Sequence, residues 1–76
     1  MKISKVRSII TKYYTVYLGN VEIGEKSNFY NLGGDSVSAI SCLKDLEDEL
    51  NVSIPIIYIV NGTVEELERF ICVEMS

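Results

Sequence analysis

Apolar residues in the first part of the chain recur every three or four positions, the period of a helix with one buried face. This stripe consists of Ile3, Val6, Ile10, Tyr13 and Tyr17. It predicts an α-helix over residues 2–17, because Gly19 and Asn20 follow and both tolerate the left-handed backbone that closes a helix.

The next segment, residues 21–35, has no sustained hydrophobic period. Polar turn clusters alternate there with apolar residues, namely Val21, Ile23, Phe29, Tyr30 and Leu32. Loops of this length are uncommon in small domains and are often functional when they occur. We therefore expect an ordered loop that its apolar residues hold against the core.

A second apolar stripe consists of Ala39, Leu43, Leu46 and Leu50. It predicts a helix over residues 36–50. Asp35 or Ser36 can cap its first turn through a side-chain oxygen, and Asn51 is suited to end it.

Residues 52–60 are rich in Ile, Val and Tyr, for which propensity alone favours a strand. A single strand has no partner in this chain, and Pro55 suits the first turn of a helix. We therefore predict a short helix or turn over residues 55–60.

Thr63 and Glu66 have the spacing of a capping box, which opens a last helix that ends near residue 73. The apolar residues of this helix are Val64, Leu67, Phe70 and Ile71. The elements together predict an all-α fold. It is a small bundle of three main helices plus one short helix, with a long ordered loop between the first two main helices.

Composition and charge indicate the number of domains and exclude some classes of function. The chain has 76 residues, 47% hydrophobic and 24% charged, so we expect one folded domain over residues 1–76, as a separate small protein or an excised domain. The formal net charge of −4 argues against a nucleic-acid binder, since such proteins neutralise phosphates with clustered Lys and Arg. The longest apolar run, residues 54–60, is far shorter than the roughly 20 residues of a membrane span. No secretory signal is recognisable, and we expect a cytoplasmic protein.

The chain contains no histidine, so Ser-His-Asp and Cys-His catalytic sets are excluded and the commonest metal ligand is missing. Cys42 and Cys72 alone do not make a zinc site, and the acidic residues lack the spacing of a calcium loop. We expect no metal, and we interpret both cysteines as small buried apolar residues.

The segment Gly33-Gly34-Asp35-Ser36 joins the loop to the second helix. It lacks the Lys and Ser/Thr of one nucleotide-binding loop and the glycine spacing of the other. Its glycines leave the approach to Ser36 open, and the start of a helix favours an attached anion. From the local pattern alone, a structural turn with Ser36 as a helix cap is the simpler interpretation.

Residues 29–40, Phe-Tyr-Asn-Leu-Gly-Gly-Asp-Ser-Val-Ser-Ala-Ile, resemble the attachment motif of phosphopantetheine carrier domains. The similarity continues through the spacing to Ile54-Pro55, the short third element, the last helix beginning at Thr63 and the basic amphipathic first helix. The chain is therefore identified as a member of that family.

By this resemblance, Ser36 carries 4′-phosphopantetheine, which a separate phosphopantetheinyl transferase attaches from coenzyme A, and Gly33, Gly34 and Asp35 complete the attachment site. The domain itself is not expected to be an enzyme. Acyl or aminoacyl groups are carried as thioesters on the thiol of the arm. The implied partners are the transferase, an adenylation or other loading enzyme, and condensation or downstream tailoring enzymes, and the carrier is expected to be a monomer.

Two branches of the family differ in this region. Phe29 with Leu32-Gly33-Gly34 is similar to peptidyl carrier domains, also called thiolation domains, of nonribosomal peptide synthesis, and we favour this function. Asp35, the acidic residues 46–50 and Ile54-Pro55 are similar to acyl carrier proteins of fatty-acid or polyketide synthesis, which are the alternative. A hypothesis of another class is an unmodified helical adaptor that binds a protein partner.

A helix that begins at Ser36 places Val37, Ile40 and Lys44 on a stripe beside the serine and away from the apolar stripe of the same helix. We predict that this stripe contacts partner enzymes. The alternative is that Val37 and Ile40 belong to the core.

Overall fold

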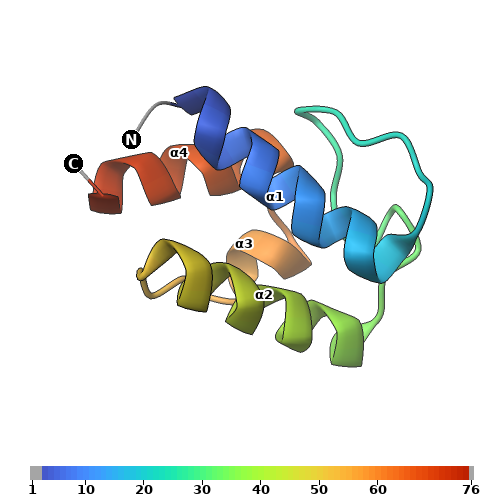
Figure 1. Cartoon of the computed structure of the whole chain (residues 1–76). Coiled ribbons are helices and arrows are strands. Elements are labelled where there is room, and N and C mark those ends of the chain that lie inside the picture. Colours follow the sequence, from blue (N-terminus) through green and yellow to red (C-terminus); the bar gives the residue numbers. More distant parts are fainter. Residues whose placement is uncertain (1–2, 76) are drawn as a thin grey trace.

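The computed structural model describes residues 3–75, with helices α1 (Ile3–Leu18), α2 (Ser36–Leu50), α3 (Ile57–Val60) and α4 (Val64–Met75). In Figure 1, α1 lies across both α4 and α2, and the short α3 lies between them. Residues 3–75 include no strand, so the predicted all-α bundle of three main helices and one short helix is confirmed. Within this described part of the chain, no helix has the length and apolar character that crossing a membrane requires.

The predicted helix boundaries agree with the structure to within a few residues. Lys2, the predicted first residue of α1, lies outside the described residues. The short helix begins at Ile57, but its first turn includes Pro55, whose carbonyl oxygen accepts a 3.1 Å hydrogen bond from the Tyr58 N–H. This apolar segment is helical rather than extended because the described chain offers no strand for it to pair with.

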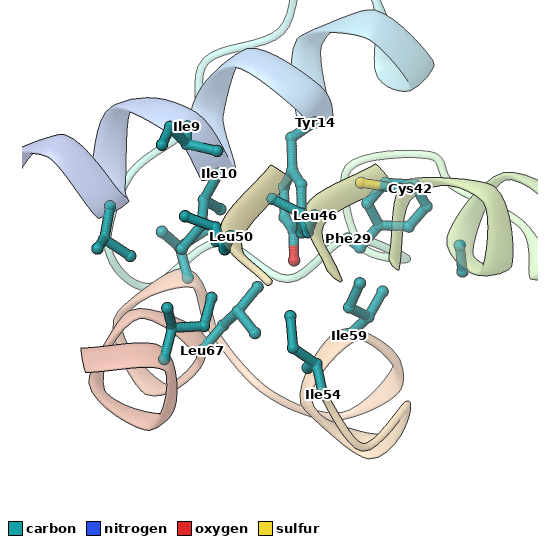
Figure 2. Packing of buried hydrophobic residues seen from close by; sticks show 14 residues of the cluster. Ile9, Ile10, Tyr14, Phe29, Cys42, Leu46, Leu50, Ile54, Ile59 and Leu67 are labelled. Atoms are coloured by element: carbon teal, nitrogen blue, oxygen red, sulfur yellow. The ribbon is translucent and has the colours of Figure 1, made fainter. Parts of the chain in front are cut away.

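One hydrophobic core joins all four helices and the loop between α1 and α2 (Figure 2). Its buried residues are Val6, Ile9, Ile10, Tyr14, Phe29, Ala39, Cys42, Leu46, Leu50, Ile54, Ile59, Val64, Leu67 and Ile71. Tyr14 points from α1 into the middle of this cluster, where its ring meets Phe29 edge-on with 5.0 Å between ring centroids. The loop thus contributes Phe29 to the core, as its apolar residues predict.

The buried face of α1 differs from the predicted one. Ile9 and Tyr14 are buried although they are not in the predicted stripe, whereas Tyr13 and Tyr17 of that stripe are half-buried and pack against the core. Adjacent aromatic residues at positions 13 and 14 fit the helical period almost equally well, and the spacing alone does not choose between them. The side chain of Ile3 lies outside what the structure describes.

Tyr13 and Tyr17 instead form polar contacts between α1 and α2. Their hydroxyls donate hydrogen bonds to the carboxylates of Glu49 and Asp45 respectively. Lys12 Nζ also lies 3.3 Å from Glu49 Oε1. The bond to Asp45 is the main reason that the pKa of Tyr17 is raised to about 12. These contacts join α1 to α2 beside the core.

The two cysteines lie in different environments and form no disulfide. Cys42 is buried, as expected, and burial raises the pKa of its thiol to about 12. Cys72 is half-buried rather than buried. Leu43, predicted to lie in the core, is also half-buried, because Cys42 takes the inward position on this turn of α2.

Hydrogen bonds tie the loop between α1 and α2 to the start of α4. The Val64 and Glu65 N–H groups donate to the carbonyl oxygens of Ser27 and Glu25, each at 2.9 Å. The side-chain amide of Asn28 donates to backbone carbonyls at the end of α3 and just after it. The loop is therefore held at several points although it has no regular secondary structure.

The capping box predicted at the start of α4 is confirmed. The Thr63 N–H donates to Glu66 Oε1 at 2.9 Å, and the Glu66 N–H donates to Thr63 Oγ1 at 3.2 Å. With the two loop carbonyls described above, each of the four N–H groups at this helix end has an acceptor.

A partly buried ion pair joins α1 to α4. Arg7 Nη2 lies 2.5 Å from Glu68 Oε1, and the Glu68 side chain is only 8% exposed. Arg7 Nε and Glu68 Oε2 have no hydrogen-bond partner among the described residues. Glu68 therefore depends on Arg7 to compensate for the removal of its charge from water.

Replacing Arg7 by Met should lower the free energy of unfolding by about 2 kcal/mol, because Glu68 then keeps a buried carboxylate without its cation. Urea denaturation followed by circular dichroism measures the loss. Lys26→Met is the matched control, since it removes the cation from an exposed pair with Glu65 and should change stability by less than about 0.5 kcal/mol. Equal losses in the two variants would contradict this account of the Arg7–Glu68 pair.

Candidate functional site

The turn before α2 folds over the buried ring of Phe29. Gly33 N–H donates to the carbonyl oxygen of Tyr30 at 3.0 Å, and Gly34 N–H donates to that of Phe29 at 3.1 Å. Gly33 has φ of 108°, a left-handed conformation that glycine adopts without strain. A Cβ added to Gly34 would lie 2.3 Å from ring atoms of Phe29. The second glycine therefore lets the backbone lie directly against a core aromatic ring.

Asp35 caps α2, which decides between the two candidate caps. Its Oδ1 accepts hydrogen bonds from the Ser38 N–H at 2.9 Å and from the Ser38 hydroxyl at 2.8 Å. Ser38 Oγ in turn accepts from the Asp35 N–H at 3.1 Å. The hydrogen bond from the Ser38 N–H is the main reason that the pKa of Asp35 lies below its ordinary value of 3.8. The N-cap of α2 is thus a carboxylate that is ionised at neutral pH.

Ser36 is the first residue of α2, and its side chain is exposed. The Tyr30 hydroxyl oxygen lies 3.5 Å from Ser36 Oγ, a contact that the periodic pattern of the sequence does not predict. An exposed hydroxyl at the end of a rigid turn is available for esterification by a second protein. The chain has no histidine to act as a base, so the deprotonating group has to come from elsewhere.

The stripe predicted beside Ser36 is exposed. Val37 and Ile40 are 77% and 57% exposed, and Lys44 is exposed as well, so the alternative that the two aliphatic residues are core is excluded. On α3, which packs against α2, Ile56 just before the helix and Ile57 within it are also exposed. Sequence reasoning missed these two, because an apolar run without polar neighbours is typical of buried segments.

A shallow hollow of about 400 Å³ lies elsewhere, between α3 and α4. Tyr58, Glu66, Arg69, Phe70 and Val73 line it. Ser36 is not part of this hollow. Ser36 itself is exposed, so a covalently attached group can extend into solvent.

Comparison with known proteins identifies the family. The family model described as the phosphopantetheine attachment site matches residues 5–71. The chain belongs to this family. Its members are carrier domains that hold 4′-phosphopantetheine covalently, and they work with a phosphopantetheinyl transferase and with synthetase partners.

Two curated relatives are gramicidin S synthase 2 from Brevibacillus brevis and gramicidin S synthase 2 from Aneurinibacillus migulanus. Each is 33% identical to this carrier chain over 63 residues, which is 82% of the chain. The aligned region is only 1% of the length of each relative. The similarity therefore concerns one small region of each of those proteins.

Replacing Gly34 by Ala should lower the free energy of unfolding by about 1–3 kcal/mol, because the new methyl group overlaps the Phe29 ring and its carbonyl oxygen. Thermal and urea denaturation measure this loss. Gly24→Ala is the control, since its Cβ would meet no atom within 4 Å and should cost less than about 0.5 kcal/mol. If the two variants are equally stable, the close packing of Gly34 on Phe29 is refuted.

Proposed function

We propose that this chain is a peptidyl carrier, or thiolation domain, of nonribosomal peptide synthesis, with its phosphopantetheine arm on Ser36. The observation that carries the proposal is the exposed hydroxyl of Ser36 at the first position of α2, at the end of a turn anchored on Phe29. The membership of the chain in the phosphopantetheine attachment family supports it.

The attachment is a phosphoryl transfer from coenzyme A. Ser36 Oγ forms an ester bond to the phosphorus that bears pantetheine, and the pyrophosphate bond on the other side of that phosphorus breaks. Adenosine 3′,5′-bisphosphate leaves with the electron pair, and the serine proton passes to a base on the transferase. Gly33, Gly34 and Asp35 hold the serine in place through the turn and the helix cap. When bound, the arm supplies a thiol on which a substrate is held as a thioester.

The domain itself is non-catalytic in this proposal, and its contribution is positional. A group tethered to Ser36 meets each partner active site at a concentration set by the length of the arm rather than by bulk diffusion. An adenylation or other loading enzyme charges the thiol, and condensation or downstream tailoring enzymes use the thioester. The carrier acts as a monomer in the cytoplasm, where the transferase and coenzyme A meet it.

The choice of branch rests on the similarity to gramicidin S synthase 2 and on the Leu32-Gly33-Gly34 sequence before the serine. Asp35 is the specific feature that favours an acyl carrier of fatty-acid or polyketide synthesis as the second candidate. Neighbouring genes separate the two, since adenylation and condensation enzymes support the first and a ketosynthase supports the second.

Incubation of the chain with coenzyme A, magnesium and a broad-specificity phosphopantetheinyl transferase should increase its intact mass by one phosphopantetheine group. Ser36→Ala should show no increase, because its side chain has no hydroxyl to esterify. Ser53→Ala removes an exposed hydroxyl outside the helices and should be modified like the wild type. An unmodified wild-type chain with several transferases would favour the adaptor hypothesis instead.

The exposed stripe beside Ser36 should contribute to recognition by partner enzymes. Val37→Ala and Lys44→Glu should each raise the KM of the transferase for the carrier by about fivefold, as expected for about 1 kcal/mol of lost contact. Val16→Ala shortens an aliphatic side chain on α1 that is 65% exposed and should leave KM unchanged. If all three variants behave alike, or if Val37→Ala loses helical signal, the assignment of this stripe is wrong.

A further inference from the structure

The start of α2 already holds an anion. The Asp35 carboxylate accepts hydrogen bonds from the Ser38 N–H and from the Ser38 hydroxyl. The N–H groups of the first turn are the ones that commonly bind a phosphate at the start of a helix. A phosphodiester on Ser36 therefore lies beside a carboxylate that already occupies one of these donors, the Ser38 N–H.

No cation on α2 lies near Ser36 to offset the negative charge of the Asp35 carboxylate. Its first basic residue is Lys44, eight residues after Ser36 and thus about 12 Å further along the helix axis. Between them the helix has no Lys or Arg. A cationic side chain close to the phosphodiester is therefore absent from α2, and a side-chain donor from outside this helix can add to its binding.

Tyr30 reaches Ser36 from the loop. Its hydroxyl oxygen is 3.5 Å from Ser36 Oγ, longer than an ordinary hydrogen bond between hydroxyls. The backbone of Tyr30 is fixed, since its N–H donates to Asn28 Oδ1 at 2.9 Å. Its half-buried ring lies beside Phe29, with 6.4 Å between ring centroids. The phenol is therefore held next to the serine by the same turn that anchors the site.

We propose that the Tyr30 hydroxyl binds the phosphodiester at the root of the arm and acts as a positioning residue. This inference rests on the proposed attachment at Ser36. In the unmodified chain either hydroxyl can donate to the other, but after esterification Ser36 Oγ has no proton and Tyr30 has to be the donor.

A charged phosphate oxygen is a stronger acceptor than the ester oxygen, and it lies two bonds further out than Ser36 Oγ, which can close the 3.5 Å gap. Tyr30 also suits the site because it is a neutral donor. A lysine in its place would be attracted to the Asp35 carboxylate more strongly than a phenol is, because lysine carries a full positive charge.

The test compares three proteins that each carry phosphopantetheine on Ser36: the wild-type chain, Tyr30→Phe and Tyr58→Phe. Tyr30→Phe keeps the ring against Phe29 and removes only the hydroxyl; Tyr58→Phe is the control, since Tyr58 lies on α3 and lines the hollow away from Ser36. The ³¹P resonance of the phosphodiester should shift in Tyr30→Phe and match the wild type in Tyr58→Phe. An identical ³¹P resonance in all three proteins overturns the inference.

A second readout needs no variant. In wild-type chain with ¹³C-labelled tyrosine, the Cζ resonance of Tyr30 should move when Ser36 is modified, while that of Tyr58 should not; an unmoved Tyr30 resonance argues against the contact. Intact mass distinguishes a failure of the attachment at Ser36 from a failure of the Tyr30 contact alone. A chain that gains no mass overturns both the attachment and the contact, whereas a chain that gains mass with unchanged Tyr30 and ³¹P signals overturns the contact alone.

Discussion

Burial of Phe29 is the constraint on which the position of Ser36 depends. The Phe29 ring is fully buried, it meets Tyr14 of α1 edge-on, and Gly34 lies directly against it. A core ring and a helix start are thereby joined by one tight turn. Because close-packed interiors transmit displacement rather than absorb it, the serine cannot move far without disturbing the core. A segment without regular secondary structure thus holds an exposed hydroxyl in a defined place.

The same loop also completes α4. Carbonyl oxygens of Glu25 and Ser27 accept the N–H groups of Glu65 and Val64, which would otherwise lack partners at the start of that helix. A domain of this size has a small core, so each satisfied helix end is a large part of its stability. The loop that carries the site and the helix that closes the bundle therefore depend on each other.

Features set by local chemistry could be predicted from the sequence. The helices follow from apolar periodicity, and Asn51 ends α2 with φ of 55°, as its tolerance of left-handed backbone predicts. The sequence could not decide whether Tyr13 or Tyr14 is the buried residue, because that depends on how α1 is rotated against α2.

The candidate site also has features that the sequence could predict and features that it could not. Exposure of Val37 and Ile40 follows from the helical period once Ser36 begins the helix. The approach of the Tyr30 hydroxyl to Ser36 depends instead on a turn in which Gly33 has positive φ, and no hydrophobic period describes such a turn.

Four large aliphatic side chains on and beside α2 and α3 are between 44% and 77% exposed: Val37, Ile40, Ile56 and Ile57. Burying an aliphatic side chain stabilises a protein by about 1.5–3 kcal/mol, so their exposure costs a small domain much of its possible stability. This cost fits the proposed role. Four side chains are too few for a permanent interface, yet they suffice for brief contacts with successive enzymes. When the substrate is tethered to the carrier, weak contact is an advantage, because each partner has to release the domain before the next can bind.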